Sequence, residues 1–408
     1  MHVAIIGQGY VGLTITEGAI KSGHQVLGVD ANPSVVASLN SGASHIEGVP
    51  NESIFRGISH GLFKATTDFS LVSGTDFVVI AVPTPLDGDG KPDLAMLKSA
   101  CESIAPYLGT ETLVINESTS FIGTLRNFIK PLIQSINPNV QFFAVSPERV
   151  DPGNLDYGVR NTPRLVGGVN EESTRRAISF YSTFCENVVK VSSPEVAEAS
   201  KLLENTFRFI NIGFINEFSV LMNAMNIPVS EVISAASTKP YGFMKFFPNI
   251  GIGGHCIPVD PLYLQKNAAE SGSTNQYISL AEDLNRKMPQ YCVDRLEEIH
   301  GPLNGQAVLL LGVSYKPNIS DTRETPAEHV IKELKSRGAK VSWHDPLVKS
   351  FIGETSSSVA GKYDLALILV KHNELKMEEW NEGPIYCVNE FPSHPDWIPI
   401  LAPSRSKD

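Results

Sequence analysis

The residues with the clearest potential for chemistry lie in one short stretch, from Gly251 to Pro261, which reads GIGGHCIPVDP. Glycine has no Cβ, so a backbone rich in glycine can pass close to a ligand. Cys256 ends this glycine run and could meet a bound substrate there, and Asp260 places a carboxylate four residues beyond the sulfur. Taken alone, the stretch is equally consistent with a glycine turn followed by a small buried thiol.

A second candidate site opens the chain. The apolar run 2–6 is followed by a G-x-G-x-x-G sequence, a segment of helical periodicity over 13–22, and a second apolar run, 25–29, that ends on Asp30. Strand, glycine turn, helix, strand and acidic residue in this order are the dinucleotide-binding fingerprint. Asp30 can bind both ribose hydroxyls and would repel a 2′-phosphate, which predicts NAD rather than NADP. The turn residues expected at the cofactor are Gly7, Gly9, Tyr10, Val11 and Gly12.

Further strand-like runs at 77–82, 112–116 and 140–145 alternate with helical or polar segments. This alternation predicts a parallel, doubly wound sheet, whose ligands bind beyond the carboxyl ends of the strands. Each of the three runs is followed by polar or proline-rich sequence that could also be ordinary turn chemistry. Together they suggest a lined cofactor crevice, in which Thr119 and Glu148 could handle water. The residues concerned are Pro83, Thr84, Pro85, Glu117, Ser118, Thr119, Ser146, Pro147, Glu148 and Arg149.

The middle of the chain predicts long helices. Apolar positions follow helical spacing from 195 to about 225, and a second long helix is expected over 277–300. Lys201 and Asn205 are four residues apart and so share one helix face, where a solvated role is the common alternative. Long helices between two α/β units commonly form a dimer interface, and we expect a homodimer.

From Gly305 the alternation of strands and helices returns, with strands expected over 307–313, 340–346 and 365–370. The loop after the first of these carries Lys316 and Arg323, which could bind an anionic ligand. The alternative is a solvent loop with a local Asp321–Arg323 pair of little energetic value. The tail from Ser404 is expected to be disordered.

These patterns predict an α/β fold, in which two Rossmann-like doubly wound parallel-sheet domains are joined by a central helical domain with a long helix. The expected boundaries are 1–192 for the NAD-binding domain, 193–301 for the central dimerisation and catalytic domain, and 302–408 for the last domain, whose cationic loop could bind an anionic ligand. A chain of 408 residues has room for two or three domains.

Composition narrows the possible partners. A formal net charge of -11 argues against nucleic acid or an anionic membrane as a general partner. The five cysteines are scattered without metal-ligand spacing, so we expect no metal site and reduced thiols in a cytoplasmic protein. No apolar run approaches the ~18 residues of a membrane span.

From Met1 to about Asn373 the chain resembles the UDP-glucose/GDP-mannose dehydrogenases, a family of nucleotide-sugar 6-dehydrogenases. The resemblance rests on six motifs in the family's order. They are Gly7–Gly12, Val82–Pro85, Ser146–Arg149, the Lys201–Asn205 helix, the Gly253–Cys256 loop with Asp260, and Lys316–Glu324. It implies NAD as cofactor, a UDP-sugar as substrate and a role in polysaccharide or glycoconjugate biosynthesis.

Some details are similar to the UDP-N-acetylhexosamine branch of the family. They include the sequence from Pro147 to Asn154, with Pro152 where the UDP-glucose branch usually has a second glutamate, and the sequences around Asn205 and Cys256. One departure is PNIG at 248–251, where that branch usually has PGPG. UDP-glucose oxidation to UDP-glucuronate is therefore the alternative activity.

The resemblance also implies a mechanism, in which a CH₂OH group is oxidised twice by NAD through a cysteine-bound thiohemiacetal and thioester. Cys256 would be the nucleophile, Lys201 and Asn205 would stabilise the oxyanion, and Asp260 and Thr119 would position a water. Glu148 would assist hydrolysis. Arg323 would contact the cofactor phosphates and Lys316 the UDP. The remaining substrate contacts implied are Glu148, Arg149, Lys201, Asn205, Arg208, Tyr241, Gly253 and Gly254.

Two other classes of protein remain open on these residues. A two-electron hydroxyacid dehydrogenase would share the first domain but would need no cysteine and would yield one NADH per product. A regulatory protein that senses NAD would share the fold without the chemistry, which the presence of Lys201, Asn205, Cys256 and Asp260 disfavours.

Overall fold

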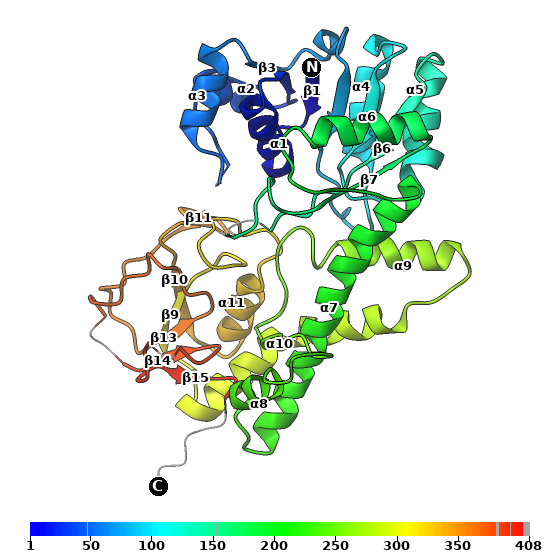
Figure 1. The fold of residues 1–408 in the computed structure, drawn as a ribbon. Coiled ribbons are helices and arrows are strands. Elements are labelled where there is room, and N and C mark those ends of the chain that lie inside the picture. Colours follow the sequence, from blue (N-terminus) through cyan, green and yellow to red (C-terminus); the bar gives the residue numbers. More distant parts are fainter. Residues whose placement is uncertain (47, 152–153, 155, 381–382, 392, 403–408) are drawn as a thin grey trace. The chain divides into compact units, whose positions relative to one another are not determined.

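A computed structural model describes residues 1–402 except 47, 152–153, 155, 381–382 and 392 (Figure 1). The predicted disordered tail from Ser404 lies outside the described residues. The chain divides into two compact units. Unit 1 comprises Met1–Glu204 and Leu262–Ser273, and unit 2 comprises Asn205–Pro261 and Thr274–Asp408.

The described residues of unit 1 form an eight-stranded sheet with the strand order β3-β2-β1-β4-β5-β6-β7-β8. Its strands are β1 (His2–Ile6), β2 (Gln25–Val29), β3 (Phe63–Thr66), β4 (Phe77–Ile80), β5 (Leu113–Asn116), β6 (Phe142–Val145), β7 (Arg164–Gly168) and β8 (Val188–Lys190). Because β1 lies between β2 and β4, the strand order reverses there. Nucleotides bind at such switch points, beyond the carboxyl ends of the strands.

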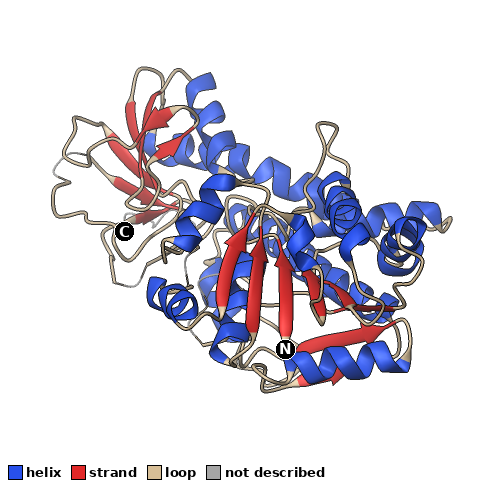
Figure 2. Cartoon of the chain, turned by 90° about the horizontal axis from the view of Figure 1, so that it is seen from above, coloured by secondary structure: helices blue, strands red, loops and turns tan. Residues whose placement is uncertain are grey.

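Helices cover both faces of this sheet (Figure 2). Along β1, Val3 and Ile5 pack into one apolar cluster, whereas Ala4 and Ile6 pack into another. A strand buried on both faces explains why β1 reads as a continuous apolar run. The first cluster includes side chains from α1 (Tyr10–Lys21), α3 (Asn51–Ser59) and α6 (Glu171–Tyr181), and the second includes side chains from α4 (Ala95–Ile104) and α5 (Lys130–Ile136). Helix α2 (Pro33–Asn40) follows β2.

One strand pair departs from the parallel pattern that the sequence predicts. Strand β7 runs antiparallel to β6, with Ala144 opposite Gly168 and Val145 opposite Gly167. A parallel neighbour requires a crossover connection, usually a helix. The described residues between β6 and β7 form no helix, and β7 reverses direction, whereas α6 connects β7 to β8 and the parallel direction returns.

Unit 2 contains a second sheet, in which the described strands have the order β10-β9-β13-β14-β15 and all pair in parallel. These are β9 (Ala307–Leu311), β10 (Lys340–His344), β13 (Leu365–Ile368), β14 (Ile385–Cys387) and β15 (Ile398–Pro399), and a small hairpin pairs β11 (Ser350–Phe351) with β12 (Glu354–Thr355). Side chains of α10 (Gln276–His300) and α11 (Ala327–Ser336) pack on Val308 and Leu310 in its main core.

The two long helices form where their periodicity predicts them. Helix α7 spans Pro194–Ala224 and α10 spans Gln276–His300, and the shorter α8 (Val229–Ala236) and α9 (Asp260–Glu270) lie between them in the chain. Helix α9 was not predicted, because its first residues, Asp260 and Pro261, end the glycine loop. Within the described part of the chain, no helix is both long and apolar enough to cross a membrane.

Candidate active site

The glycine turn between β1 and α1 allows a ligand to approach its backbone closely. Gly7 has a φ of 90°, and a Cβ on Gly12 would lie 1.7 Å from the carbonyl oxygen of Gly7. A Cβ on Gly9, in contrast, would meet no atom within 4 Å. Gly9 is also the N-cap of α1 and supplies no side chain to its free N–H groups. The turn therefore leaves an open cradle at a helix N-terminus, which suits a pyrophosphate.

Asp30 lies at the end of β2, beside this cradle. Its Oδ2 accepts a hydrogen bond from the Gln8 N–H at 2.8 Å, and its Oδ1 accepts one from the Asn32 N–H at 2.9 Å. Each carboxylate oxygen retains one further acceptor position. The residues of the turn thus fit NAD, because the cradle would hold the pyrophosphate while Asp30 would accept the ribose hydroxyls.

The ends of β4 and β5 are joined by side-chain hydrogen bonds. Ser118 Oγ donates to the Val82 carbonyl at 2.7 Å, and the Tyr263 hydroxyl donates to the Thr84 carbonyl at 3.1 Å. Ser118 and Thr119 also line a small pocket together with residues after β6 and on α7. Its lining is Ser118, Thr119, Ser120, Val145, Pro147, Glu198 and Lys201. Four predicted positions, Pro83, Thr84, Ser118 and Thr119, therefore follow adjacent strands at one edge of the sheet, and Lys201 shares the pocket with the last two.

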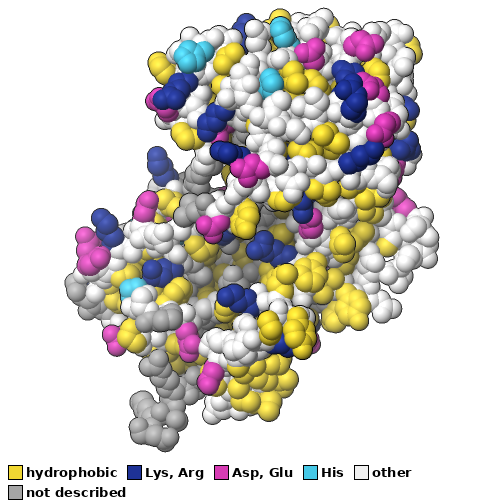
Figure 3. All heavy atoms as spheres, viewed as in Figure 1, with side chains coloured by type: hydrophobic (Ala, Val, Ile, Leu, Met, Phe, Trp, Pro, Cys, Tyr) yellow, Lys and Arg dark blue, Asp and Glu magenta, His cyan; other side chains and the backbone are white. Residues whose placement is uncertain are grey.

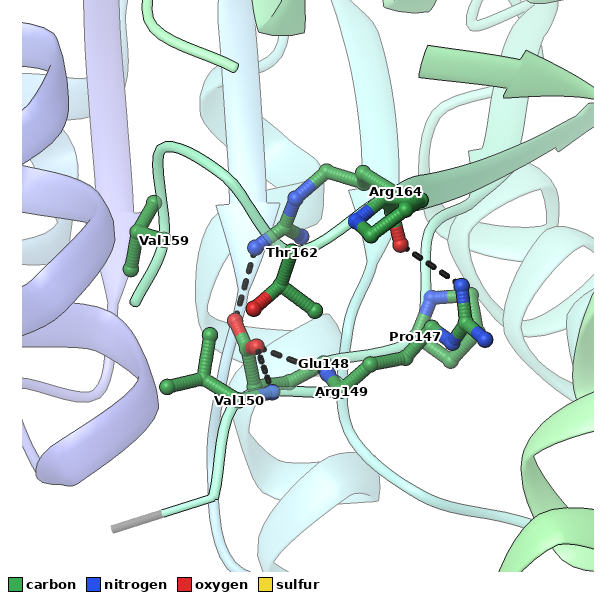
Figure 4. Close-up of a pocket in the computed structure, with 8 residues that line it drawn as sticks. Pro147, Glu148, Arg149, Val150, Val159, Thr162 and Arg164 are labelled. Atoms are coloured by element: carbon green, nitrogen blue, oxygen red, sulfur yellow. Dashed lines mark hydrogen bonds and ion pairs between the residues drawn. The ribbon is translucent and has the colours of Figure 1, made fainter. Parts of the chain in front are cut away.

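Glu148 is held as a buried carboxylate (Figure 4). Its Oε1 accepts the backbone N–H groups of Arg149 and Val150 at 2.7 and 2.6 Å, and its Oε2 pairs with Arg164 Nη2 at 2.7 Å. Burial by itself would raise the pKa of Glu148, but Arg164, these two N–H groups and Lys201 hold it below its ordinary value. Glu148 is therefore ionised, and its oxygens already accept hydrogen bonds from Arg164 and the two backbone N–H groups.

The same guanidinium binds a second buried carboxyl group. Arg164 Nη1 lies 2.8 Å from Glu117 Oε2, and the Tyr181 hydroxyl donates to Glu117 Oε1. Burial raises the pKa of Glu117 to about 7, against the opposing charge of Arg164. One guanidinium between two carboxyl groups therefore leaves Glu148 charged and makes Glu117 the group that takes up a proton near neutrality.

Arg149 is engaged by α7. Its Nη2 lies 2.7 Å from Glu204 Oε1, and its Nε donates to Glu204 Oε2 at 3.1 Å. Its Nη1 donates to the Pro163 carbonyl at 2.6 Å (Figure 4). This geometry is a two-pronged ion pair, which is more directional than a single contact. It fixes the loop after β6, on which Glu148 also lies.

In unit 2, three of the predicted catalytic residues are connected. Asn205 Nδ2 donates to Asp260 Oδ2 at 2.5 Å, and the Asp260 N–H donates to the Cys256 carbonyl at 2.8 Å. Asp260 is buried, whereas Cys256 is partly exposed at the end of the glycine loop. The first residue of α9 thus joins the cysteine loop to α7.

The glycine loop lies directly on the loop after β9. The Gly254 N–H donates to the Arg323 carbonyl at 3.0 Å. A Cβ on Gly253 would lie 2.7 Å from both the Glu324 carbonyl oxygen and Tyr315 Cβ, and a Cβ on Gly254 would lie 2.9 Å from the Tyr315 ring. Glycine is therefore required at both positions for this contact, which places Cys256 beside the loop that carries Lys316 and Arg323.

Two predicted substrate contacts lie apart from these connections, since Arg208 is exposed on α7 and Tyr241 is 72% exposed in the loop after α8. The predicted pair between Asp321 and Arg323 is present, with Nε of Arg323 at 3.0 Å from both oxygens of Asp321. Glu117 was among the strand-end residues expected at the crevice, but Arg164 and its pairing with Glu117 were not predicted, because no sequence pattern relates a residue that begins β7 to one that follows β5.

Family models match most of the chain in the order of the sequence. They describe the NAD binding domain of the UDP-glucose/GDP-mannose dehydrogenase family at residues 1–185, its central domain at 195–287 and its UDP binding domain at 309–386. The chain belongs to the UDP-glucose/GDP-mannose dehydrogenase family. It is accordingly an NAD-dependent nucleotide-sugar dehydrogenase, as the resemblance implied.

Several members of the family are similar over nearly their whole length. The UDP-N-acetyl-D-mannosamine dehydrogenase of Pyrococcus horikoshii is 32% identical over 388 residues, which cover 93% of this chain and 91% of that one. The UDP-N-acetyl-D-glucosamine 6-dehydrogenase of Pseudomonas aeruginosa is 33% identical, with 92% of each chain covered. The structure of a UDP-glucose dehydrogenase from Pyrobaculum islandicum superposes with a TM-score of 0.89 at 25% identity and covers 98% of each chain.

Proposed function

We propose that this enzyme oxidises the C6 hydroxymethyl group of a UDP-N-acetylhexosamine to a carboxylate, in two oxidations of two electrons each. The observation that carries this proposal is the connection of Asn205, Asp260 and Cys256 within unit 2. A second oxidation needs a means of holding the aldehyde, and a partly exposed cysteine beside an ordered amide and carboxylate can provide it.

NAD, held at the glycine turn, would supply the hydride acceptor for each oxidation at C6. Cys256 Sγ adds to the C6 aldehyde to give a thiohemiacetal, which becomes a thioester that water hydrolyses. Asn205 has a second N–H beyond the one that it donates to Asp260, and this N–H can stabilise the oxyanion. Lys201 lies one helical turn earlier on α7 and can add its charge.

The buried carboxylates suggest a refinement of the hydrolytic step. Glu148 is ionised and already bound by Arg164 and two backbone N–H groups, so it is a weak base for water. We propose that Glu148 fixes the loop after β6 and provides a negative charge there. Asp260 keeps its predicted role of positioning the water.

The sugar is proposed on the names of the relatives. Both the Pyrococcus and the Pseudomonas proteins are dehydrogenases of UDP-N-acetylhexosamines, and the chain shares the sequence around Glu148 and Cys256 that is typical of that branch. The second candidate substrate is UDP-glucose, favoured by the likeness to the Pyrobaculum structure.

A substrate panel tests this assignment. UDP-GlcNAc, UDP-ManNAc and UDP-glucose are each supplied with NAD, and NADH and acid product are both measured. We expect the highest kcat/KM with one of the two N-acetylhexosamines, and two NADH for each uronate. A higher kcat/KM with UDP-glucose would overturn the assignment of an N-acetylhexosamine as substrate. One NADH per product would overturn the proposal of a second oxidation.

The proposed assembly is a homodimer, formed through α7. Apolar side chains on this 31-residue helix are exposed at intervals of seven or four residues, including Leu203 at 66% and Phe214 at 59%. The full set is Val196, Leu203, Phe207, Phe214, Leu221 and Met225. This spacing is the seam of a helix that packs against another helix, and a second copy would present the same seam.

The apolar surface extends beyond α7, which favours a stable contact. In unit 2, hydrophobic side chains gather around α8 and the end of α7 (Figure 3). Tyr277 and Leu280 on α10 are also exposed. Monomeric proteins rarely expose contiguous apolar patches of this kind. We also place the enzyme in the cytoplasm, where its five free cysteines would stay reduced.

A further inference from the structure

His255 precedes the cysteine, and the proposed function gives it no part. Its Nδ1 is buried and has no hydrogen-bond partner among the described residues. The nearest acid is Asp321, whose Oδ2 lies 3.7 Å from that nitrogen. This distance is that of an ion pair rather than a hydrogen bond, so a small shift of the ring would complete the contact.

Asp321 is itself fixed in place. It accepts the Arg323 N–H at 3.0 Å, the Arg323 Nε at 3.0 Å and the Arg323 Nη2 at 2.5 Å. The hydrogen bond from Gly254 to the Arg323 carbonyl ties the same residue to the cysteine loop. The carboxylate beside His255 is therefore positioned by its own loop and by the glycine loop.

The charges of this cluster favour a protonated imidazole. Burial by itself would lower the pKa of His255, but Asp321 and the neighbouring Cys256 raise it to about 9. Contacts with His255 and Arg323 outweigh burial and hold the pKa of Asp321 well below its ordinary value. The charged and titratable groups that act on His255 within unit 2 are thus Asp321, Cys256 and Arg323.

We propose that His255 is the proton partner of Cys256 and that Asp321 orients its ring. In this step a neutral imidazole takes up the thiol proton of Cys256, which gives the protonated ring that these charges favour, and the electron pair of the broken S–H bond stays on Sγ. The resulting thiolate forms the S–C6 bond, the carbonyl electron pair moves to the oxygen, and that oxygen takes up the same proton from the imidazolium, which returns the ring to its neutral form. A nucleophile, a base and an acid that orients the base follow the arrangement of many cysteine enzymes.

This inference rests on the proposed function for the identity of the electrophile, but the reactivity of the thiol can be measured without any substrate. Cys101, Cys185, Cys292 and Cys387 are buried, so a small alkylating reagent should label Cys256 selectively. The rate of labelling by iodoacetamide is followed from pH 5 to pH 10 by mass spectrometry of the Cys256 peptide. Because thiolate is the reactive form, the rate profile reports the ionisation of the thiol.

Three variants are compared with the wild type in this assay. His255→Asn removes the base, Asp321→Asn removes the acid that orients it, and His329→Asn makes the same change at an exposed histidine on α11. We expect His255→Asn to slow labelling at pH 7 at least tenfold and to move the profile to higher pH. We expect a smaller shift in the same direction for Asp321→Asn, and a wild-type profile for His329→Asn.

Labelling of Cys101 and Cys292, buried in unit 1 and unit 2 respectively, is followed in the same digest and would reveal a variant that fails to fold. Should His255→Asn fail this check, His255→Gln and Asp321→Asn carry the test. A folded His255 variant with an unchanged profile would overturn the proposal. A shifted profile would support the role of His255 even if no UDP-sugar were oxidised. The labelling assay and the substrate panel therefore test the role of His255 and the proposed function independently.

Discussion

Cys256 differs from the other cysteines in its surroundings. Burial raises the pKa of Cys101 and Cys387 to about 12, and it also raises that of Cys292, so these thiols are inert at neutral pH. Cys256 is partly exposed and follows a loop whose glycines permit close contact on one side. Among the thiols of this chain, it is therefore the one suited to covalent chemistry.

We predict that Cys256→Ser folds and binds NAD but forms no uronate. Loss of the nucleophile should lower acid formation at least ~10³-fold, because a hydroxyl without a strong base adds poorly to an aldehyde. Acid product is quantified by chromatography, and NAD binding by calorimetry. Cys387→Ala, which removes a buried thiol from unit 2, is the matched control. Acid formation by Cys256→Ser at close to the wild-type rate would rule out the covalent mechanism.

Among single residues, the sequence predicted those site residues that lie in local motifs. The glycine turn with Asp30 and the loop with Cys256 and Asp260 are each contiguous or nearly so, and their backbone requirements are visible in the glycines. The contact between Arg164 and Glu117 could not be predicted, since it arises from sheet topology, where β7 turns back beside β6. His255 was visible in its motif, but its partner Asp321 depends on the packing of two loops.

Among the elements, α7 contributes to unit 1 through one buried acid. Glu198 Oε2 accepts the Gly123 N–H at 2.5 Å, and its Oε1 accepts the Leu125 N–H at 2.9 Å. These N–H groups precede α5 and would otherwise be buried without partners. Burial nevertheless raises the pKa of Glu198 to about 7, despite both hydrogen bonds. The helix therefore holds this loop with a group that titrates near neutrality.

This shift predicts how stability depends on pH. Between its ordinary value of 4.5 and about 7, Glu198 binds a proton in the folded chain but not in the unfolded one. Its contribution to stability is therefore greatest below pH 4.5 and is lost as the pH rises to about 7. The loss corresponds to roughly 3 kcal/mol. Glu198→Gln does not titrate, so the difference in unfolding midpoint, wild type minus variant, should fall from pH 4.5 to pH 8.

The control for this prediction is Glu195→Gln on the same helix. Partial burial by itself would raise the pKa of Glu195, but its contact with Arg126 at 2.7 Å, its own backbone N–H and Ser193 together lower it. The difference in unfolding midpoint between the wild type and Glu195→Gln should therefore not fall as the pH rises. Thermal unfolding followed by circular dichroism at each pH gives both differences. Parallel pH curves for the wild type and Glu198→Gln would contradict the assignment.

The elements themselves were predictable where they are long or wholly apolar. Strands β1 and β2 and helices α7 and α10 begin and end within a few residues of their predicted bounds. Strands β14 and β15 have three and two residues and are too short to show a period. The reversal at β7 was not predictable in this way, because the described residues of its connection to β6 form no helix and an irregular connection leaves no periodic signal.

At the scale of the whole molecule, the remaining question is what covers the apolar seam of α7. The seam includes Phe207, Phe214 and Leu221, which are each exposed, although burying a side chain of this size contributes about 1.5–3 kcal/mol. A twofold assembly would bury every seam residue twice, once in each copy. The seam therefore predicts that the folded chain is dimeric at micromolar concentrations.

Charge placed in the seam should separate the copies. We predict that Phe214→Glu raises the dimer dissociation constant at least a hundredfold, because each copy then loses a buried ring and faces a like charge. Phe55→Glu on α3 is the matched control, since Phe55 and Phe214 are both 59% exposed. Light scattering after size-exclusion chromatography should find a dimer for the wild type and Phe55→Glu, and a monomer for Phe214→Glu. A monomeric wild type, or a dimeric Phe214→Glu, would show that α7 does not form the interface.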